Sequence, residues 1–509
     1  MAEYLTPGVY IEEIEVGAKP IEGVSTSTAG FLGQTERGPV DPRLVTSFEQ
    51  YLRLYGGYIN ESYLAYAVEG FFRNGGTRCF IGRIAAGDAK TATLTLSSKK
   101  SISDENTDGK VIKVSALGPG DWGNRIKISV KDGSLTSDKR PLFKLVVDYF
   151  KTDADVKSKS EPYISELYDN LSADPNASDY YLKKINDISS LITLERITEG
   201  MPDTMDSTQM AAESNAIASK VSVADYEGKS TSPEMRRGLS AFEGIDEISI
   251  VCAPDEVKDD LKNLGDSLKT HCETLKDRFA ILQSKQSSVP NASLRPSDSK
   301  YAAFYYPWIY VLDPATNLPK LVPPGGHIAG IYARVDQERG VHKAPANEIV
   351  RGAIELEFNI TKDEQALLNP RGVNCIRAFT GRGIRVWGAR TASSDPSWKY
   401  VNVRRLFIFL EKSIEAATQW AVFEPNDEKL WARMRQTINQ FLTTVWRNGA
   451  LMGSTQDEAF FVKCDRTTMT QDDIDNGRLI MLIGVAPVKP AEFVIFRIAQ
   501  VAKGTEISE

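Results

Sequence analysis

The sequence predicts a multidomain protein that combines a central α/β domain, a mostly β insertion and an α+β C-terminal domain. In the α/β parts, apolar strands alternate with amphipathic helices, a pattern typical of a mostly parallel sheet covered by helices. The insertion shows short alternating stretches separated by Gly, Asp and Ser, and the C-terminal part shows two long helices. The 509 residues suffice for about two to four domains. The predicted segments are an N-terminal arm (1–24), the α/β domain (25–88 plus 241–345), the insertion (89–240), the C-terminal domain (346–490) and a C-terminal strand and arm (491–509).

A strand precedes any domain core. Along Val9, Tyr10, Ile11 and Glu12 the side chains alternate, with Val9 and Ile11 on one apolar face. A lone strand with one apolar face is unstable in water, so we expect it to pair with the edge of a sheet.

The α/β pattern is interrupted by the insertion and then resumes. Its first part is predicted as strands at 27–33 and 78–84 with helices at 46–54 and 62–74 between them. The insertion is predicted to hold strands at 91–96, 111–114, 126–130 and 143–147. The second part is predicted as strands at 245–252, 279–283 and 301–312 with helices at 255–275 and 328–338.

The C-terminal third is the most regular stretch. An apolar helix containing Leu406 and Trp420 ends at Glu424-Pro-Asn-Asp, and a second helix over 427–447 has an amphipathic face with Asn426 as its N-cap. Strands are predicted at 459–464, 479–486 and 491–498. The last of these strands is apolar on both faces, which is typical of a strand covered on both sides.

Charge is distributed unevenly. Residues 371–405 contain eight cations and one acid, whereas residues 151–215 contain 13 acids and six bases. These stretches are either two solvated surfaces or, in a polymer, patches that meet between neighbouring subunits. The net charge of −7 argues against bulk nucleic-acid binding.

Composition argues against a disulfide-bonded, membrane-spanning or secreted protein. The five cysteines stand singly, which favours buried free thiols, and no apolar run is long enough for a transmembrane helix. We expect no secretory signal, synthesis in the cytoplasm and no direct membrane insertion.

Several long ungapped segments resemble the contractile tail sheath proteins of phages and of phage-tail-like injection systems. Those with the strongest likeness are RVWGARTASSDPSWKYVNVRRLFIFLE, QWAVFEPND, EAFFVKCD and IGVAPVKPAEFVIFRI; PGVYIEE, FFRNGGTRCFIGRI, GPGDWGNRIKI and RVDQERGVHKAPAN also resemble the family. The resemblance covers about residues 1–130 and 300–500.

The resemblance implies a structural subunit and a set of partners. The subunit would polymerise helically around an inner tube protein and contract to drive the tube through a target envelope, with baseplate and terminal cap proteins as further partners. The family's central domain is called subtilisin-like for its architecture, and both terminal arms pair with sheets of neighbouring subunits. The particle would be a phage tail, a particle released from the cell or a membrane-anchored injector.

From this resemblance we assign two sets of site residues. The subunit-linking strands are predicted at Val9, Tyr10, Ile11, Glu12, Phe493, Val494, Ile495, Phe496 and Ile498. Contact with the inner tube is predicted for the charged face of the 427–447 helix, at Glu428, Lys429, Arg433 and Arg435, with an ordinary solvated helix face as the alternative.

A search for catalytic or cofactor sites predicts none. Phosphate-loop and dinucleotide signatures are missing, and the three histidines (271, 327 and 342) are too separated for a zinc site. The glycine pair before His327 either binds an anion or forms a tight turn. Cys464 ends an apolar strand, which favours burial over a nucleophilic role. An α/β hydrolase-like enzyme with a cryptic site is the alternative function, and a secreted toxin or adhesin a third reading.

Overall fold

The computed structural model describes residues 21–98, 109–137, 141–158, 160–212, 219–230, 232, 235–291 and 293–495. The chain divides into two compact units, one of residues 25–405 and one formed by the chain before and after it. This division lies later than the boundary predicted between residues 345 and 346. Each unit is described by itself.

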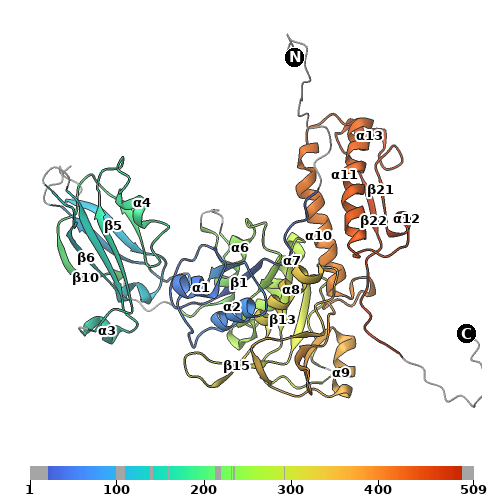
Figure 1. The fold of residues 1–509 in the computed structure, drawn as a ribbon, viewed down its shortest axis with the longest axis horizontal. Helices are drawn as coiled ribbons and strands as arrows, with labels where there is room; N and C mark the ends of the chain where they lie inside the picture. The colour runs from blue at the N-terminus through green and yellow to red at the C-terminus, as the bar shows by residue number, and fades with distance from the viewer. Residues whose placement is uncertain are drawn as a thin grey trace, which may run out of the picture. The chain divides into compact units, whose positions relative to one another are not determined.

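A nine-stranded sheet forms the centre of the first unit (Figure 1). Its strand order is β2-β3-β1-β12-β13-β14-β19-β20-β17, in which β3 to β19 run parallel and the other three pair antiparallel. The last three strands along this order come from the segment predicted as C-terminal domain, which explains the later division. The strands are β1 (Ala29–Gly33), β2 (Arg43–Val45), β3 (Cys79–Arg83), β12 (Ile250–Cys252), β13 (Phe279–Gln283), β14 (Ala302–Tyr306), β17 (Glu348–Ile349), β19 (Val373–Phe379) and β20 (Gly383–Val386).

Two predicted elements of this unit are divided in the structure. The strand predicted at 301–312 ends at Tyr306, and the chain after Pro307 enters a separate three-stranded sheet. The helix predicted at 255–275 begins as two short 3-10 turns, because Lys258 between them has an extended backbone (φ −76°, ψ 144°). The other elements of the unit outside the insertion are α1 (Phe48–Tyr55), α2 (Leu64–Arg73), α5 (Val223–Glu227), α6 (Gly238–Phe242), α7 (Leu264–Leu275), β15 (Ile309–Leu312), β16 (Pro319–Val322), α8 (Gly325–Arg339), β18 (Ala353–Leu356) and α9 (Lys362–Leu368).

The insertion contains two four-stranded antiparallel sheets, ordered β10-β6-β7-β8 and β11-β4-β5-β9. Residues of β7 are alternately buried and half-buried, and side chains from both sheets join one hydrophobic core around Trp122. The alternation explains why period two in this segment predicted strands. The elements are β4 (Ala92–Ser97), β5 (Lys110–Ala116), β6 (Ile126–Asp132), β7 (Phe143–Tyr149), α3 (Asp153–Lys157), β8 (Ile164–Leu171), α4 (Tyr181–Ile185), β9 (Ile192–Arg196), β10 (Met205–Gln209) and β11 (Ala211–Ala212).

Two glycines allow α8 to pack directly on the backbone of α2. A Cβ atom at Gly326 would lie 2.2 Å from the carbonyl oxygen of Ala67, and one at Gly330 would lie 2.4 Å from that of Phe71. Atoms that are not bonded do not approach so closely, so both positions require glycine.

A buried polar relay joins the ends of β12 and β13 to the start of α8. Glu256 Oε1 accepts hydrogen bonds from the backbone amide of Gln283 at 2.8 Å and from its side chain at 3.4 Å. Gln283 Oε1 in turn accepts from the amide of Gly325 at 2.6 Å, so this amide is not free for the anion considered above. Burial raises the pKa of Glu256 to about 8, well above its ordinary value of 4.5.

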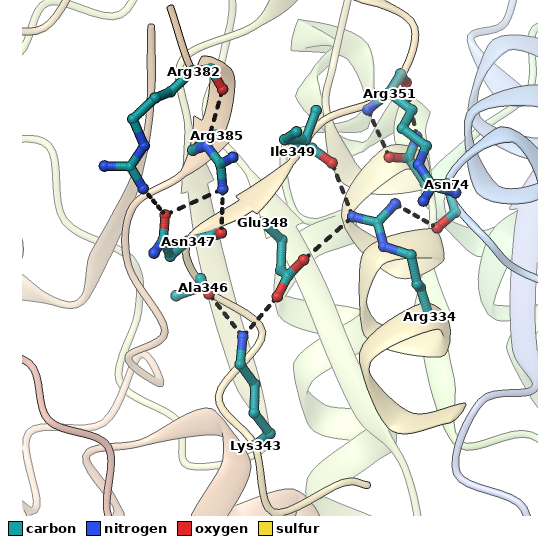
Figure 2. A network of polar contacts seen from close by, with 10 residues as sticks. All are labelled: Asn74, Arg334, Lys343, Ala346, Asn347, Glu348, Ile349, Arg351, Arg382 and Arg385. Carbon is teal, nitrogen blue, oxygen red and sulfur yellow. Dashed lines mark hydrogen bonds and ion pairs between the residues drawn. The ribbon is translucent and has the colours of Figure 1, made fainter. Parts of the chain in front are cut away.

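Arg334 on α8 holds the segment before and along β17 in place (Figure 2). It is 5% exposed and donates to the carbonyl oxygens of Asn74 and Ile349, each at 3.0 Å. Asn74 also exchanges two hydrogen bonds with the backbone of Arg351, at 2.8 and 2.9 Å. Glu348 bonds Lys343 at 2.7 Å and lies 3.7 Å from Arg334.

A buried ion pair lies where the chain enters and leaves the first unit. Arg405 donates to both carboxylate oxygens of Asp336, at 2.9 and 2.6 Å, and to the carbonyl oxygen of Thr26 at 2.8 Å. Thr26 Oγ1 donates to the same carboxylate at 2.7 Å, and both charged side chains are 4% exposed. The segment after Val24 and the segment before Leu406 are therefore fixed to α8 and to each other.

The second unit contains two long helices and a two-stranded sheet, and Figure 1 shows α10 and α11 side by side with β21 against α11. The N-cap of α11 is Asp427, which accepts from the amides of Lys429 and Leu430, rather than the predicted Asn426. Asn426 instead accepts from Trp431 Nε1 at 2.8 Å. The elements are α10 (Val401–Thr418, whose first turn belongs to the first unit), α11 (Glu428–Arg447), α12 (Gln456–Ala459), β21 (Phe460–Lys463), α13 (Gln471–Asp475) and β22 (Leu482–Val485).

Among the residues placed by the structure, no helix is both long and apolar enough to cross a membrane.

Replacing Gly330 with alanine tests the contact between α2 and α8. We expect Gly330→Ala to lower the free energy of unfolding by about 1–3 kcal/mol, because the helices must separate to admit the methyl group. Urea-induced unfolding measures the change. Gly244→Ala is the matched control, since a Cβ atom there meets no atom within 4 Å. Equal effects of the two substitutions would show that the close approach is not required.

Replacing Glu256 with glutamine tests the buried carboxyl group through pH. Because the folded state holds the proton up to about pH 8 and the unfolded state releases it near pH 4.5, the group's stabilising effect is complete below pH 4.5 and is lost as pH rises towards 8. We expect the free energy of unfolding of Glu256→Gln, measured in urea, to exceed that of the parent at pH 8 by at least about 1 kcal/mol. At pH 5 we expect this difference to shrink. Glu355→Gln, at an exposed position, is the control. An unchanged difference across this range would contradict the assignment.

Candidate assembly interface

A parallel sheet of this kind binds ligands at the carboxyl ends of its strands, at the point where the strand order reverses. Here that point lies between β1 and β12, and buried side chains of the chain itself occupy it. Asp255, which is 0% exposed, accepts hydrogen bonds from Ser62 Oγ at 2.6 Å, Tyr63 N at 2.9 Å and Tyr226 OH at 3.1 Å. Lys258 adds an ion pair at 3.3 Å. Ser62 bonds the carboxylate directly, which leaves no place between them for the histidine of a serine triad.

The titratable groups considered for catalysis are buried apart from one another. His271 lies on α7 and His327 on α8, and burial lowers their pKa values to about 4 and about 3. Burial also lowers the pKa of His342, which follows α8. The five thiols are buried, and burial raises the pKa of each, Cys464 included. In the part of the chain that the structure describes, no three His, Cys, Asp or Glu residues gather as a metal site.

The four residues predicted to contact an inner tube do not share one surface. Glu428, Lys429 and Arg433 are exposed on α11. Glu428 pairs with Arg466 at 3.3 Å, and the Arg433 guanidinium lies 3.9 Å from the centre of the Trp420 ring. Arg435 is only partly exposed and donates to the carbonyl oxygen of Cys464, so it lies towards the sheet rather than on the charged face.

The cationic segment 371–405 is not one solvated surface, as its first interpretation assumed. Arg390, Arg404 and Arg405 are at most 8% exposed. The Arg404 guanidinium lies 4.4 Å from the centre of the Trp398 ring, and Arg405 pairs with Asp336. The remaining cations of the segment stay at least partly exposed, and those within 371–387 have no acid in their own stretch of sequence.

In the described part of the chain, the sheet of the second unit has two strands, and no third strand pairs with either edge. Strands β21 and β22 pair antiparallel, from Phe460 opposite Val485 to Lys463 opposite Leu482. Phe461 and Leu482 are 45% and 53% exposed. Two-stranded sheets are marginal in water, and unpaired edges attract further strands.

The predicted linking strands are described only in part. Val9, Tyr10, Ile11, Glu12, Phe496 and Ile498 lie outside the described residues. Phe493, Val494 and Ile495 are 70%, 70% and 79% exposed, and residues 491–495 form no strand. The covered strand predicted at 491–498 is therefore not found in its described part, where no sheet among the described residues covers these side chains.

Sequence reasoning missed one exposed residue, Phe423, in the connection between α10 and α11. It is fully exposed and has a positive φ of 69°, a backbone conformation rare for a bulky side chain. The Val-Phe pair between the apolar helix and Glu-Pro-Asn-Asp could have indicated an exposed apolar tip, because it follows the last periodic apolar position, Trp420.

Comparisons with known proteins identify the family to which the chain belongs. The family model described as the phage tail sheath protein central domain matches residues 228–392, and the one described as the phage tail sheath C-terminal domain matches residues 393–500. Together the two models cover more than half of the 509 residues.

Curated tail sheath proteins are similar over part of their length. That of Salmonella phage ViI is 30% identical over 217 residues, which are 42% of this chain and 33% of that protein. That of Burkholderia phage BcepMu is 31% identical over 161 residues, 29% of this chain and 33% of that protein. The matched region thus spans about a third of the length of these curated relatives.

Solved sheath structures share the fold over nearly the whole chain. The helical sheath of the anti-feeding prophage in its contracted state gives a TM-score of 0.60 at 24% identity, over 98% of this chain and 100% of that chain. A sheath tail protein of Listeria innocua gives 0.59 at 12% identity, over 92% and 97%. The predicted mixed α/β multidomain fold is thereby confirmed, and with the two family models the comparisons show that the chain belongs to the phage tail sheath protein family.

Proposed function

We propose that the chain is the structural subunit of a contractile sheath that polymerises helically around an inner tube and contracts to drive the tube through a target envelope. The observation that supports this most is a sheet that has two strands among the described residues, in the same unit as an exposed apolar segment, Phe493–Ile495. Within one chain both features cost free energy, whereas strand exchange between subunits satisfies both.

Strand addition supplies the linkage between subunits. A strand that joins the edge of β21 or β22 gains main-chain hydrogen bonds along its length and buries alternate side chains. We propose that residues 9–12 and 493–498 are those strands. Because donor and acceptor are different surfaces, the association is heterologous and continues as an open helical polymer. Contraction is then a rigid-body rearrangement during which the arms keep subunits connected.

The comparisons suggest the partners and the setting. The similar solved sheaths include an extracellular contractile injection system in the contracted state and the baseplate of the anti-feeding prophage. We propose an inner tube protein, a baseplate and a terminal cap as partners, and a phage tail or phage-tail-like particle as the location, after synthesis in the cytoplasm.

We propose no catalytic role. The parallel core of the nine-stranded sheet supports the subtilisin-like architecture, but Asp255 and its four partners fill the place where such a sheet would act on a ligand. The likeness is therefore one of architecture, and the hydrolase alternative has no support in these contacts.

Removing an arm tests the linkage. We expect the full chain to form long tubes in negative-stain electron microscopy, and chains without residues 1–20 or without residues 491–509 to remain monomeric, because each deletion removes one donated strand. Tubes formed by both truncated chains would retain the sheath but place the linkage elsewhere. Compact particles from all three would contradict the proposed function.

Reversing charge on α11 tests the contact with the tube. We expect Lys429→Glu with Arg433→Glu to polymerise alone yet fail to assemble on the inner tube, because both side chains are exposed and cationic. Arg435 is left unchanged because its bond to Cys464 belongs to the fold. Lys183→Glu with Lys184→Glu in the insertion is the matched control. Sheathed tubes of normal length from the α11 variant would refute the tube contact.

A further inference from the structure

The connection between α10 and α11 presents an apolar tip of Val422 and Phe423. Val422 is 59% exposed and Phe423 is fully exposed. The φ of Phe423, 69°, strains an L-residue with a bulky side chain, and no packing among the described residues compensates for it. A strained, fully exposed aromatic residue therefore indicates a contact with residues beyond those described, which a second copy of the chain can provide.

The tip is held rigidly from both sides. The amide of Val422 donates to Gln419 O at 3.2 Å, and Trp420 packs into the core beneath Arg433. After the tip, the Asn426 side chain bonds Trp431 at 2.8 Å and the carbonyl oxygen of Arg478 at 3.2 Å. A side chain presented on a fixed loop loses little conformational entropy on binding, as is typical of an interface anchor.

The segments next to the tip are rich in acidic residues. Residues 421–429 and 465–478 are brought together by the bond from Asn426 to Arg478 and by the pair of Glu428 with Arg466. These two stretches contain seven acids and three bases. The tip is thus an aromatic ring in a surrounding of net negative charge.

The hairpin of β19 and β20 offers the opposite chemistry. Residues 371–387 contain four arginines and no acid. Arg382 donates to Asn347 Oδ1 at 3.2 Å and Arg385 to Asn347 O at 2.7 Å, side by side as Figure 2 shows. Arg377 donates to the neutral Gln365 at 3.0 Å. The hydrogen bonds of these guanidinium groups position them without neutralising their charge.

Aromatic rings complete this arginine face, which we define as Arg377, Phe379, Arg382, Arg385 and Trp387. The rings of Phe379 and Trp387 are half-buried, with centres 4.5 Å apart. The guanidinium groups of Arg377 and Arg382 lie 5.4 and 5.9 Å from the centre of the Phe379 ring. Guanidinium planes and aromatic rings accept a further aromatic ring by stacking, and arginine pairs with carboxylates around it.

We propose that Phe423 of one subunit docks on the arginine face of a second copy of the chain. The proposal rests on the helical homopolymer proposed above and names an interface in it that uses neither arm. The tip and the face are different surfaces, so their contact is heterologous and fits an open helix. Their opposite charge excludes tip-to-tip and face-to-face contacts.

Single substitutions at the tip separate assembly from folding. Phe423→Gly relieves the positive φ, so the chain should be at least as stable as the parent, yet the critical concentration for polymerisation should rise about tenfold or more. Phe423→Ser should act similarly. Leu135→Ser, which removes another exposed apolar side chain, 73% exposed in the insertion, should leave the critical concentration unchanged. Sedimentation and electron microscopy of the full chain and its variants measure the critical concentration.

A charge exchange tests the partner. Glu424→Arg and Arg382→Glu should each raise the critical concentration about tenfold, and the double variant should return to within about threefold of the parent. No recovery in the double variant would overturn the pairing.

Two other outcomes are informative. If Phe423→Ser polymerises like the parent alone but fails only with the inner tube, the tip belongs to the tube and the proposed docking is wrong. If the parent chain forms no tubes, the homopolymer itself fails, and the proposal falls with it.

Discussion

The buried ion pair of Arg405 with Asp336 fixes both passages of the chain between its two units. Burying two charges costs solvation free energy, which is offset only when every oxygen and nitrogen finds a partner. Thr26 supplies the remaining partners, with its hydroxyl and its carbonyl oxygen. The segment that leads to the N-terminal arm and the helix α10 therefore start from one rigid point on α8.

Three features that cost free energy in a single chain would be satisfied by contacts in a polymer. No third described strand pairs with β21 or β22, the side chains Phe493–Ile495 are exposed, and the Phe423 backbone is strained. Meanwhile Asp255 and Glu256 fill the sheet edge at which an α/β enzyme would bind its substrate. Polar side chains of the chain itself thus occupy that sheet edge, whereas the exposed apolar side chains named above lie on the surface.

Sequence patterns predicted the elements whose signals are local. Strand β13 lies where it was predicted, at Phe279–Gln283, and α11 begins within one residue of its predicted start, because apolar period and capping residues act over one element. The break at Pro307 had a local signal, since proline interrupts a strand. The inward position of Arg435 and the burial of Arg405 depend on partners distant in sequence, so no local pattern reveals them. The linking residues remain predictions, since most of them lie outside the described residues.

Hydrogen–deuterium exchange at single-residue resolution on β21 and β22 tests strand exchange most directly. The outward-facing amides of Phe460–Lys463 and Leu482–Val485 should exchange rapidly in the dissociated chain and become strongly protected in tubes, because donated strands would bond them. Equal exchange of these amides in tubes and in the dissociated chain would show that no strand is added there, and would contradict a sheath linked by its arms.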